Sequence, residues 1–173
     1  TDSDAERFLA AVLAQEDRPS LVLDADALNL LAPLADEAAS SGPALGPKAV
    51  LTPHPGEAGR LLGISASQVQ SDREAAVTAL QRRSGAVVVL KGAATLVCDG
   101  ERMFTNPTGN SGLGTAGSGD VLAGILGALL ASGQLEPFDA ACLAVHLHGA
   151  AGDLAARRWS ERRLCAADRP DAP

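Results

Sequence analysis

The sequence predicts an α/β fold: a mostly parallel sheet covered by helices on both faces, with one small β-hairpin. Short apolar runs alternate with helical segments along the chain, which is typical of parallel strands buried on both sides. The length of 173 residues suits one domain, and no linker or internal repeat divides it. We therefore expect a single domain over residues 1–173.

The expected strands are short apolar runs bounded by polar or turn residues. Three of them are Leu21–Leu23, Ala49–Leu51 and Ala86–Leu90, and each is too short for a helix. The second ends at Pro53 and Pro55, which cannot continue a ladder. Residues 95–98 and 102–105 flank an Asp-Gly pair and predict the hairpin.

Helical periodicity fills the segments between these strands. The predicted helices are 4–15, 27–32, 34–39, a helix through Leu61 and Leu62, 67–83, 121–131 and 138–158. Pro33 separates the second from the third. The helix over 67–83 is expected to turn Val69, Ala76, Val77 and Leu80 to one face, and the Gly/Pro/Ser-rich segment 40–47 is expected to be a loop.

Composition and charge exclude several classes of protein. The 14 basic and 21 acidic residues give a net charge of −7 without a basic stripe, so nucleic-acid binding is not expected. No apolar run approaches the roughly 18 residues that span a membrane. The acidic start is unlike a signal peptide, which favours a cytoplasmic location. Three widely spaced cysteines read as small buried hydrophobic residues in a reducing compartment, not as a metal site.

A glycine-rich segment, 106–120, leads into the apolar helix over 121–131 and carries the clearest functional pattern. Glycines let successive backbone N–H groups converge, and a helix N-terminus favours anions, so Gly117, Ser118 and Gly119 form a plausible anion hole for a phosphoryl group. Asp120 could be a general base or an ordinary first-turn acid. The segment lacks the Gly-Lys-Ser/Thr of a P-loop and does not follow a long buried strand as a dinucleotide fingerprint does.

The Gly-x-Gly-Asp pattern at 117–120 resembles the ribokinase-like kinases of small molecules. Four pieces together resemble the NAD(P)H-hydrate dehydratases of that superfamily, and they are 22–29, 51–57, 90–95 and 106–124. That family repairs hydrated nicotinamide cofactors. The resemblance implies that ADP or ATP phosphorylates the hydroxyl of NAD(P)HX with Mg²⁺ present, and that phosphate is then eliminated.

The resemblance also implies roles for individual residues. Asp120 would be the catalytic base and, with His54, would contact the hydrated cofactor. Glu57, at the position of the glutamate in the ribokinase Asn-x-x-Glu motif, would organise Mg²⁺ through water. The AMP part of the nucleotide would lie on Lys91, Gly92, Ala93, Ala94, Thr95 and Gly119. From the residues alone, His146 and His148 read as packing or surface residues, and Asp24 and Asp26 as helix-capping acids in preference to metal ligands.

The chain departs from the family pattern in two places. Residues 113–117 read Leu-Gly-Thr-Ala-Gly where the family usually has Met-Ala-Thr-Gly-Gly. Family members also carry many more residues before the piece matching Leu21, so the resemblance implies the C-terminal portion of the family domain. We accordingly expect a homo-oligomer or dependence on the N-terminal segment. Two alternatives stay open: a related kinase of hydroxyethylthiazole or a pyrimidine, and a non-catalytic nucleotide-binding fragment.

Overall fold

The structure, a computed structural model, describes residues 3–35 and 45–159. Five strands form one sheet in the order β1-β2-β3-β4-β5. Their bounds are β1 Leu21–Leu23, β2 Ala49–Leu51, β3 Val87–Leu90, β4 Leu96–Cys98 and β5 Met103–Thr105. The first three strands are parallel, whereas β4 pairs antiparallel with both β3 and β5. The sheet is therefore mixed and not mostly parallel, because the predicted hairpin joins β3 directly and contributes half of the pairings.

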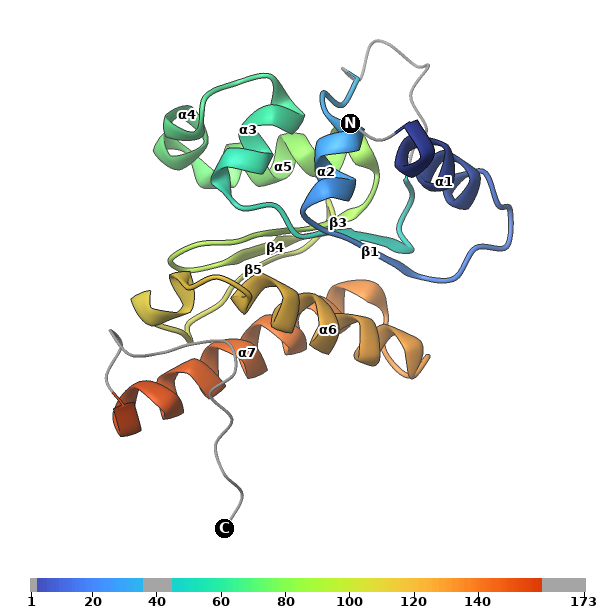
Figure 1. The fold of residues 1–173 in the computed structure, drawn as a ribbon. Coiled ribbons are helices and arrows are strands. Elements are labelled where there is room, and N and C mark those ends of the chain that lie inside the picture. The colour runs from blue at the N-terminus through green and yellow to red at the C-terminus, as the bar shows by residue number, and fades with distance from the viewer. Residues whose placement is uncertain (1–2, 36–44, 160–173) are drawn as a thin grey trace.

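Helices cover both faces of this sheet, as expected (Figure 1). One layer holds α1 (Ser3–Leu13), α2 (Asp26–Leu31), α3 (Pro55–Leu62), α4 (Ala66–Ser71) and α5 (Arg73–Ser84). The other holds α6 (Ser118–Ala131) and α7 (Pro137–Trp159), preceded by the 3₁₀ turn η1 (Ser111–Gly114). No helix in the described ranges is both long and apolar enough to cross a membrane.

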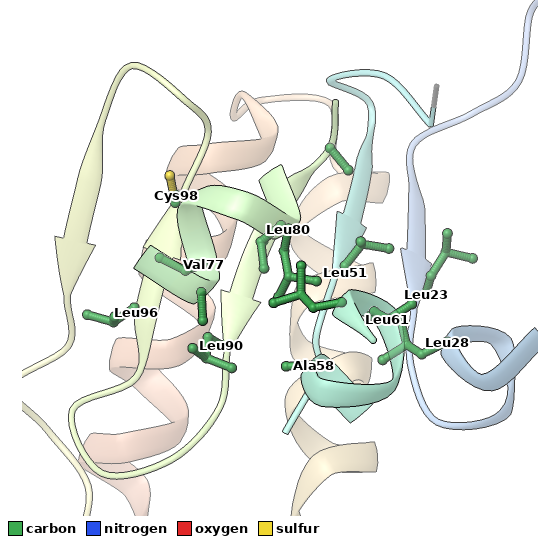
Figure 2. Close-up of a cluster of buried hydrophobic side chains, with 14 of the residues drawn as sticks. Leu23, Leu28, Leu51, Ala58, Leu61, Val77, Leu80, Leu90, Leu96 and Cys98 are labelled. Carbon is green, nitrogen blue, oxygen red and sulfur yellow. The ribbon is translucent and has the colours of Figure 1, made fainter. Parts of the chain in front are cut away.

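Successive side chains along each strand point to opposite faces of the sheet, so the core consists of two clusters, one on each face. Leu51 and Leu90 point to the α2–α5 side, where Leu28, Leu61 and Leu80 meet them (Figure 2). Val50 of β2 and Val87 and Val89 of β3 belong to the second cluster, with side chains of α6 and α7 on the other side. Both faces are thus buried, which explains why these strands are continuously apolar in sequence.

Two helices differ from the prediction at Asp72 and Ser118. The single helix expected over 67–83 is two helices, because Asp72 has φ −148° and its side chain accepts a hydrogen bond from the N–H of Ala75, capping a new helix. The apolar helix expected over 121–131 begins at Ser118, so the last residues of the glycine-rich segment belong to its first turn. The face predicted for 67–83 is nevertheless buried.

The remaining differences are small. Leu34 and Ala35 are not helical, and the rest of the helix expected over 34–39 lies outside the described residues, as does 40–44 of the expected loop. Cys98 is buried and Cys142 half-buried, and both are free thiols, as expected of small hydrophobic residues. Burial raises the pKa of the Cys142 thiol to about 11, so this thiol stays protonated at neutral pH.

Candidate active site

A cavity of about 600 Å³ lies where β2 and β3 end and α3 and α6 begin. Four segments build it: the turn into α3, the loop after β3, the segment between β5 and α6, and the middle of α7. Its lining includes His54, Pro55, residues 91–95, Asn106, residues 108–111, residues 113–115, Ser118, Gly119, Leu122, Val145, His148 and Gly149. The carboxyl ends of parallel strands are the usual place for ligands in α/β sheets.

The structure brings most of the predicted site residues to this cavity. His54, residues 91–95, Ser118 and Gly119 all line it. The described lining does not include Gly117, Glu57 or Asp120. Glu57 is buried just behind His54, whereas Asp120 is exposed in the first turn of α6, next to Gly119.

Lys91 is held by two carboxylates. Its Nζ lies 2.8 Å from Asp24 Oδ1 and 3.9 Å from Glu57 Oε2, and all three side chains are at least four-fifths buried. Asp24 was expected to cap α2, but Ala25 occupies the N-cap position of that helix and no side chain caps it, so the expectation was wrong. Asp24 follows β1 and Lys91 follows β3. Because β1, β2 and β3 are parallel neighbours, their carboxyl ends lie on the same side of the sheet, and Asp24 reaches Lys91 past the end of β2.

The loop after β3 has an unusual backbone that a neighbouring arginine supports. Gly92 has φ 137° and Ala94 has φ 52°, a left-handed conformation that is uncommon for a residue with a Cβ. Arg73 donates to the carbonyls of Leu90 and Lys91, at 3.0 and 3.4 Å. Sequence reasoning missed this contact, because Arg73 reads as an ordinary helical residue. The supported loop presents Gly92, Ala93 and Ala94 to solvent at the cavity.

His54 and Glu57 form a reciprocal cap at the start of α3. His54 Nδ1 accepts from the N–H groups of Gly56 and Glu57, at 2.9 and 3.3 Å, and Glu57 Oε2 accepts from the His54 N–H at 2.8 Å. Pro55 at the first helical position favours this geometry. Because Nδ1 is an acceptor, the neutral ring carries its proton on Nε2 and has a donor left for a ligand.

The carboxylate of Glu57 is the acidic group of the site for which a role with Mg²⁺ was predicted. One oxygen of Glu57 is engaged by the His54 N–H, and the other lies 3.5 Å from His54 Nε2. In the described ranges, no group of three or more His, Cys, Asp or Glu side chains is placed to hold a metal. Mg²⁺ usually keeps several waters and binds substrate phosphates, which is compatible with this donor set.

The N-terminus of α6 faces Lys91. Gly117 has φ 83° and turns the chain into the helix, whose first N–H groups lack acceptors within the helix. A Cβ added at Gly119 would lie 3.4 Å from Lys91 Nζ. Asp24 Oδ2 would lie 3.6 Å from the same Cβ and, with Glu57, balances the ammonium charge, so the helix N-terminus is the element at this point that suits an anion.

His148 also belongs to the site, although it was expected to be a packing or surface residue. Its Nε2 lies 3.1 Å from Ser118 Oγ, and it lines the cavity. Burial lowers the pKa of His148 below its ordinary value, so the ring is neutral at pH 7. Its separation of 30 residues from Ser118 gave no signal in the sequence. His146 is exposed, in line with the expectation.

Solved structures define the class of this fold. A ribokinase-like superfamily protein from Enterococcus faecalis is 31% identical with a TM-score of 0.72, and the match covers 91% of this chain and 52% of that one. The ADP/ATP-dependent NAD(P)H-hydrate dehydratase of Bacillus subtilis, co-crystallised with ATP and Mg²⁺, is 31% identical with a TM-score of 0.79. That match covers 95% of this chain and 56% of the other. The fold is therefore α/β and ribokinase-like.

The chain belongs to the NAD(P)H-hydrate dehydratase family, because the sequence model of that family matches residues 1–167. The ADP-dependent (S)-NAD(P)H-hydrate dehydratase of Neisseria meningitidis is 51% identical over 148 residues, or 84% of this chain and 49% of that protein. A bifunctional NAD(P)H-hydrate repair enzyme of Moorella thermoacetica is 50% identical over 149 residues, or 85% of this chain and 27% of that protein. This chain thus spans half or less of the length of these curated relatives.

Proposed function

We propose that this chain carries the nucleotide-dependent dehydration of hydrated NAD(P)H, in a single α/β domain over residues 1–173. The observation that carries the proposal is one cavity that joins the loop 91–95, His54 and the α6 N-terminus, in a chain of this family. The proposed reaction transfers the terminal phosphoryl group of ADP or ATP to the hydroxyl of the hydrated ring. Phosphate then leaves with a proton from the adjacent carbon, which restores the ring double bond.

The nucleotide is assigned to the cavity itself. In this proposal Lys91 to Thr95 and Gly119 hold the AMP part, and Gly117, Ser118 and Gly119 form the anion hole. The exposed residues Gly92, Ala93 and Ala94 and the positive φ angles of Gly92 and Ala94 support close approach of a ligand. The N–H groups at the α6 N-terminus stabilise the negative charge on the phosphoryl oxygens during the transfer.

The hydrated cofactor is assigned to the side of α6 that Asp120 occupies. Asp120 is exposed beside Gly119, so its carboxylate can accept the proton of a hydroxyl that approaches the phosphoryl group from outside the cavity. His54 contributes its Nε2–H as a donor to the substrate. Attack then breaks the bond between the terminal phosphorus and its bridging oxygen, and AMP or ADP leaves.

Mg²⁺ is proposed to arrive with the nucleotide. Glu57 would act on it through water, because both carboxylate oxygens already lie near His54. When bound, the ion supplies charge neutralisation on the phosphates. The Bacillus subtilis dehydratase crystallised with ATP and Mg²⁺ supports this assignment.

Different observations bear on the two alternatives, a related small-molecule kinase and a non-catalytic nucleotide-binding fragment. A hydroxyethylthiazole kinase of Pyrococcus horikoshii has a TM-score of 0.66 at 23% identity, a likeness that shows the fold alone. A non-catalytic fragment, or one that works as a homo-oligomer or with a complementary segment, is compatible with the position of β1 at the edge of the described sheet. A cytoplasmic location remains part of the proposal.

Turnover of NADHX by the purified chain tests the proposal. Absorbance of NADH should appear on addition of ADP or ATP with Mg²⁺, and the Asp120→Asn variant should be slower by about 10²-fold or more, the scale of a lost general base. Nucleotide affinity of that variant should be nearly unchanged. Phosphorylation of hydroxyethylthiazole without NADH formation would favour the kinase, and nucleotide binding without any turnover would favour the non-catalytic fragment.

A further inference from the structure

One wall of the cavity consists of residues 108–115, a segment with little regular structure of its own. Within it only η1 forms a turn of helix, and Gly109 has φ 102°, which glycine tolerates best. Seven of these eight residues line the cavity. A wall of this kind keeps one shape only where contacts from outside the segment hold it.

Asp153 of α7 supplies such contacts. Its Oδ2 accepts from the Gly109 N–H at 2.9 Å, and its Oδ1 accepts from Asn110 Nδ2 at 2.9 Å. Asn110 Oδ1 in turn accepts from the Gly112 N–H at 3.0 Å. The first two hydrogen bonds hold the pKa of Asp153 below its ordinary value, so the ionised carboxylate is the form that binds the wall. Asp153 itself is not in the described lining of the cavity.

The helix surface around Asp153 is shaped for the same segment. A Cβ at Gly149 would lie 2.3 Å from Thr108 Oγ1, and one at Gly152 would lie 2.8 Å from the Leu113 side chain. Positions 149, 152 and 153 share one face of α7, because 152 and 153 lie three and four residues beyond 149. On this face of α7, the two glycines leave room for the segment 108–115 to pack closely, and the Asp153 carboxylate binds it by hydrogen bonds.

We propose that Asp153 is a positioning residue for the nucleotide cavity: it fixes the wall 108–115 through Gly109 and Asn110 without touching the ligand. The role rests on the proposed function, because the ligand assigned to the cavity is the nucleotide. The carboxylate is required because it accepts two hydrogen bonds at once, from a backbone group and from an amide.

An exchange of the two partners tests the role. Asp153→Asn keeps an oxygen for the Gly109 N–H but turns an amide donor toward the Asn110 donor. Asn110→Asp places two carboxylates face to face. The double variant N110D/D153N restores all three hydrogen bonds: the amide now at position 153 accepts from Gly109 and donates to the carboxylate now at position 110, which still accepts from the Gly112 N–H. Net charge in the double variant equals that of the natural chain.

Calorimetric titration with ADP should show affinity weakened about tenfold by Asp153→Asn, the scale of a lost hydrogen bond to a charged group. Asn110→Asp should weaken it further, and N110D/D153N should recover most of the loss. Asp139→Asn is the matched control, because it makes the same change at an exposed position of α7 and should leave affinity unchanged. Unchanged affinity in Asp153→Asn, or an exchange variant no better than Asp153→Asn, overturns the proposal.

A second readout separates this role from the proposed function. Hydrogen exchange of the Gly109 amide, followed by NMR, should be slow in the natural chain and in N110D/D153N. It should be faster in Asp153→Asn, because repulsion between the amide donors at positions 153 and 110 displaces the side chain that carries the acceptor for Gly109. If the natural chain binds no ADP, the nucleotide assignment fails, and this exchange pattern still decides whether Asp153 fixes the wall. Equal exchange rates in all variants overturn that role.

Discussion

Lys91 should be the side chain of the cavity whose removal costs the most stability. Its Nζ lies 2.8 Å from Asp24 Oδ1 and 3.9 Å from Glu57 Oε2 in a mostly buried setting. At an effective dielectric constant of about 20, these distances correspond to gross attractions of about 6 and 4 kcal/mol. Most of that attraction offsets the cost of taking three charges out of water, so the intact cluster contributes little net stability.

Removing one charge from the cluster of Asp24, Glu57 and Lys91 lowers the free energy of unfolding by an amount that depends on which charges remain unpaired. Lys91→Met leaves the mostly buried carboxylates of Asp24 and Glu57 without the cation that lies near both, which should lower the free energy of unfolding by about 3–5 kcal/mol. Asp24→Asn leaves Lys91 paired with Glu57 and keeps an oxygen for its hydrogen bond, so it should cost only about 1–2 kcal/mol. The double variant D24N/K91M should be more stable than Lys91→Met alone, since one unpaired carboxylate remains instead of two.

Equilibrium unfolding in urea at neutral pH measures these differences. Lys48→Met is the matched control, because Lys48 is exposed and its loss should change stability by less than about 0.5 kcal/mol. Equal costs for Lys91→Met and Asp24→Asn, or additive costs in the double variant, would refute the charge-compensation argument.

Glycine packing, histidine burial and the edge position of β1 each support a further prediction. Gly119→Val should weaken ADP binding because its side chain would crowd Lys91, whereas Gly124→Val, at a helical position with open space, should not; calorimetry compares them. Burial lowers the pKa of His148 from the ordinary 6.5, so the unfolding free energy should fall as pH drops below about 6.5, where the unfolded chain takes up a proton that the folded one resists. His148→Gln should remove that part of the pH dependence in unfolding titrations. Finally, β1 is an apolar edge of the described sheet, so light scattering should show self-association, and a monodisperse, fully active monomer would contradict it.

The elements predicted best from sequence were those fixed by local apolar runs and turn chemistry. The three apolar strands and the Asp-Gly hairpin were placed within a residue or two. The apolar runs of β2, β3 and β4 are buried, whereas the largely exposed β5 is set by the turn before it. The mixed character of the sheet was missed, since local sequence does not say which strand a hairpin joins. The break at Asp72 was missed because an acid inside an amphipathic stretch also fits a continuous helix.

The residues of the site also differ in how well they could be predicted from the sequence. Residues that belong to contiguous motifs, such as Lys91 to Thr95 and His54, line one cavity, and the binding roles assigned to them stay predictions. Partners that meet only in three dimensions were not predicted: Asp24 with Lys91, His148 with Ser118, and Asp153 with Gly109. The roles of Asp120 and Glu57 stay predictions.

A crystal structure of the chain with ADP and Mg²⁺ would show directly whether the nucleotide occupies the cavity between the loop 91–95 and α6. We expect the AMP part against the loop 91–95 and the terminal phosphate within hydrogen-bond distance of the first-turn N–H groups of α6, with Asp120 open to solvent on the far side of that phosphate. A nucleotide bound elsewhere on the chain, with the loop 91–95 and Gly119 free of contacts to it, would contradict the account.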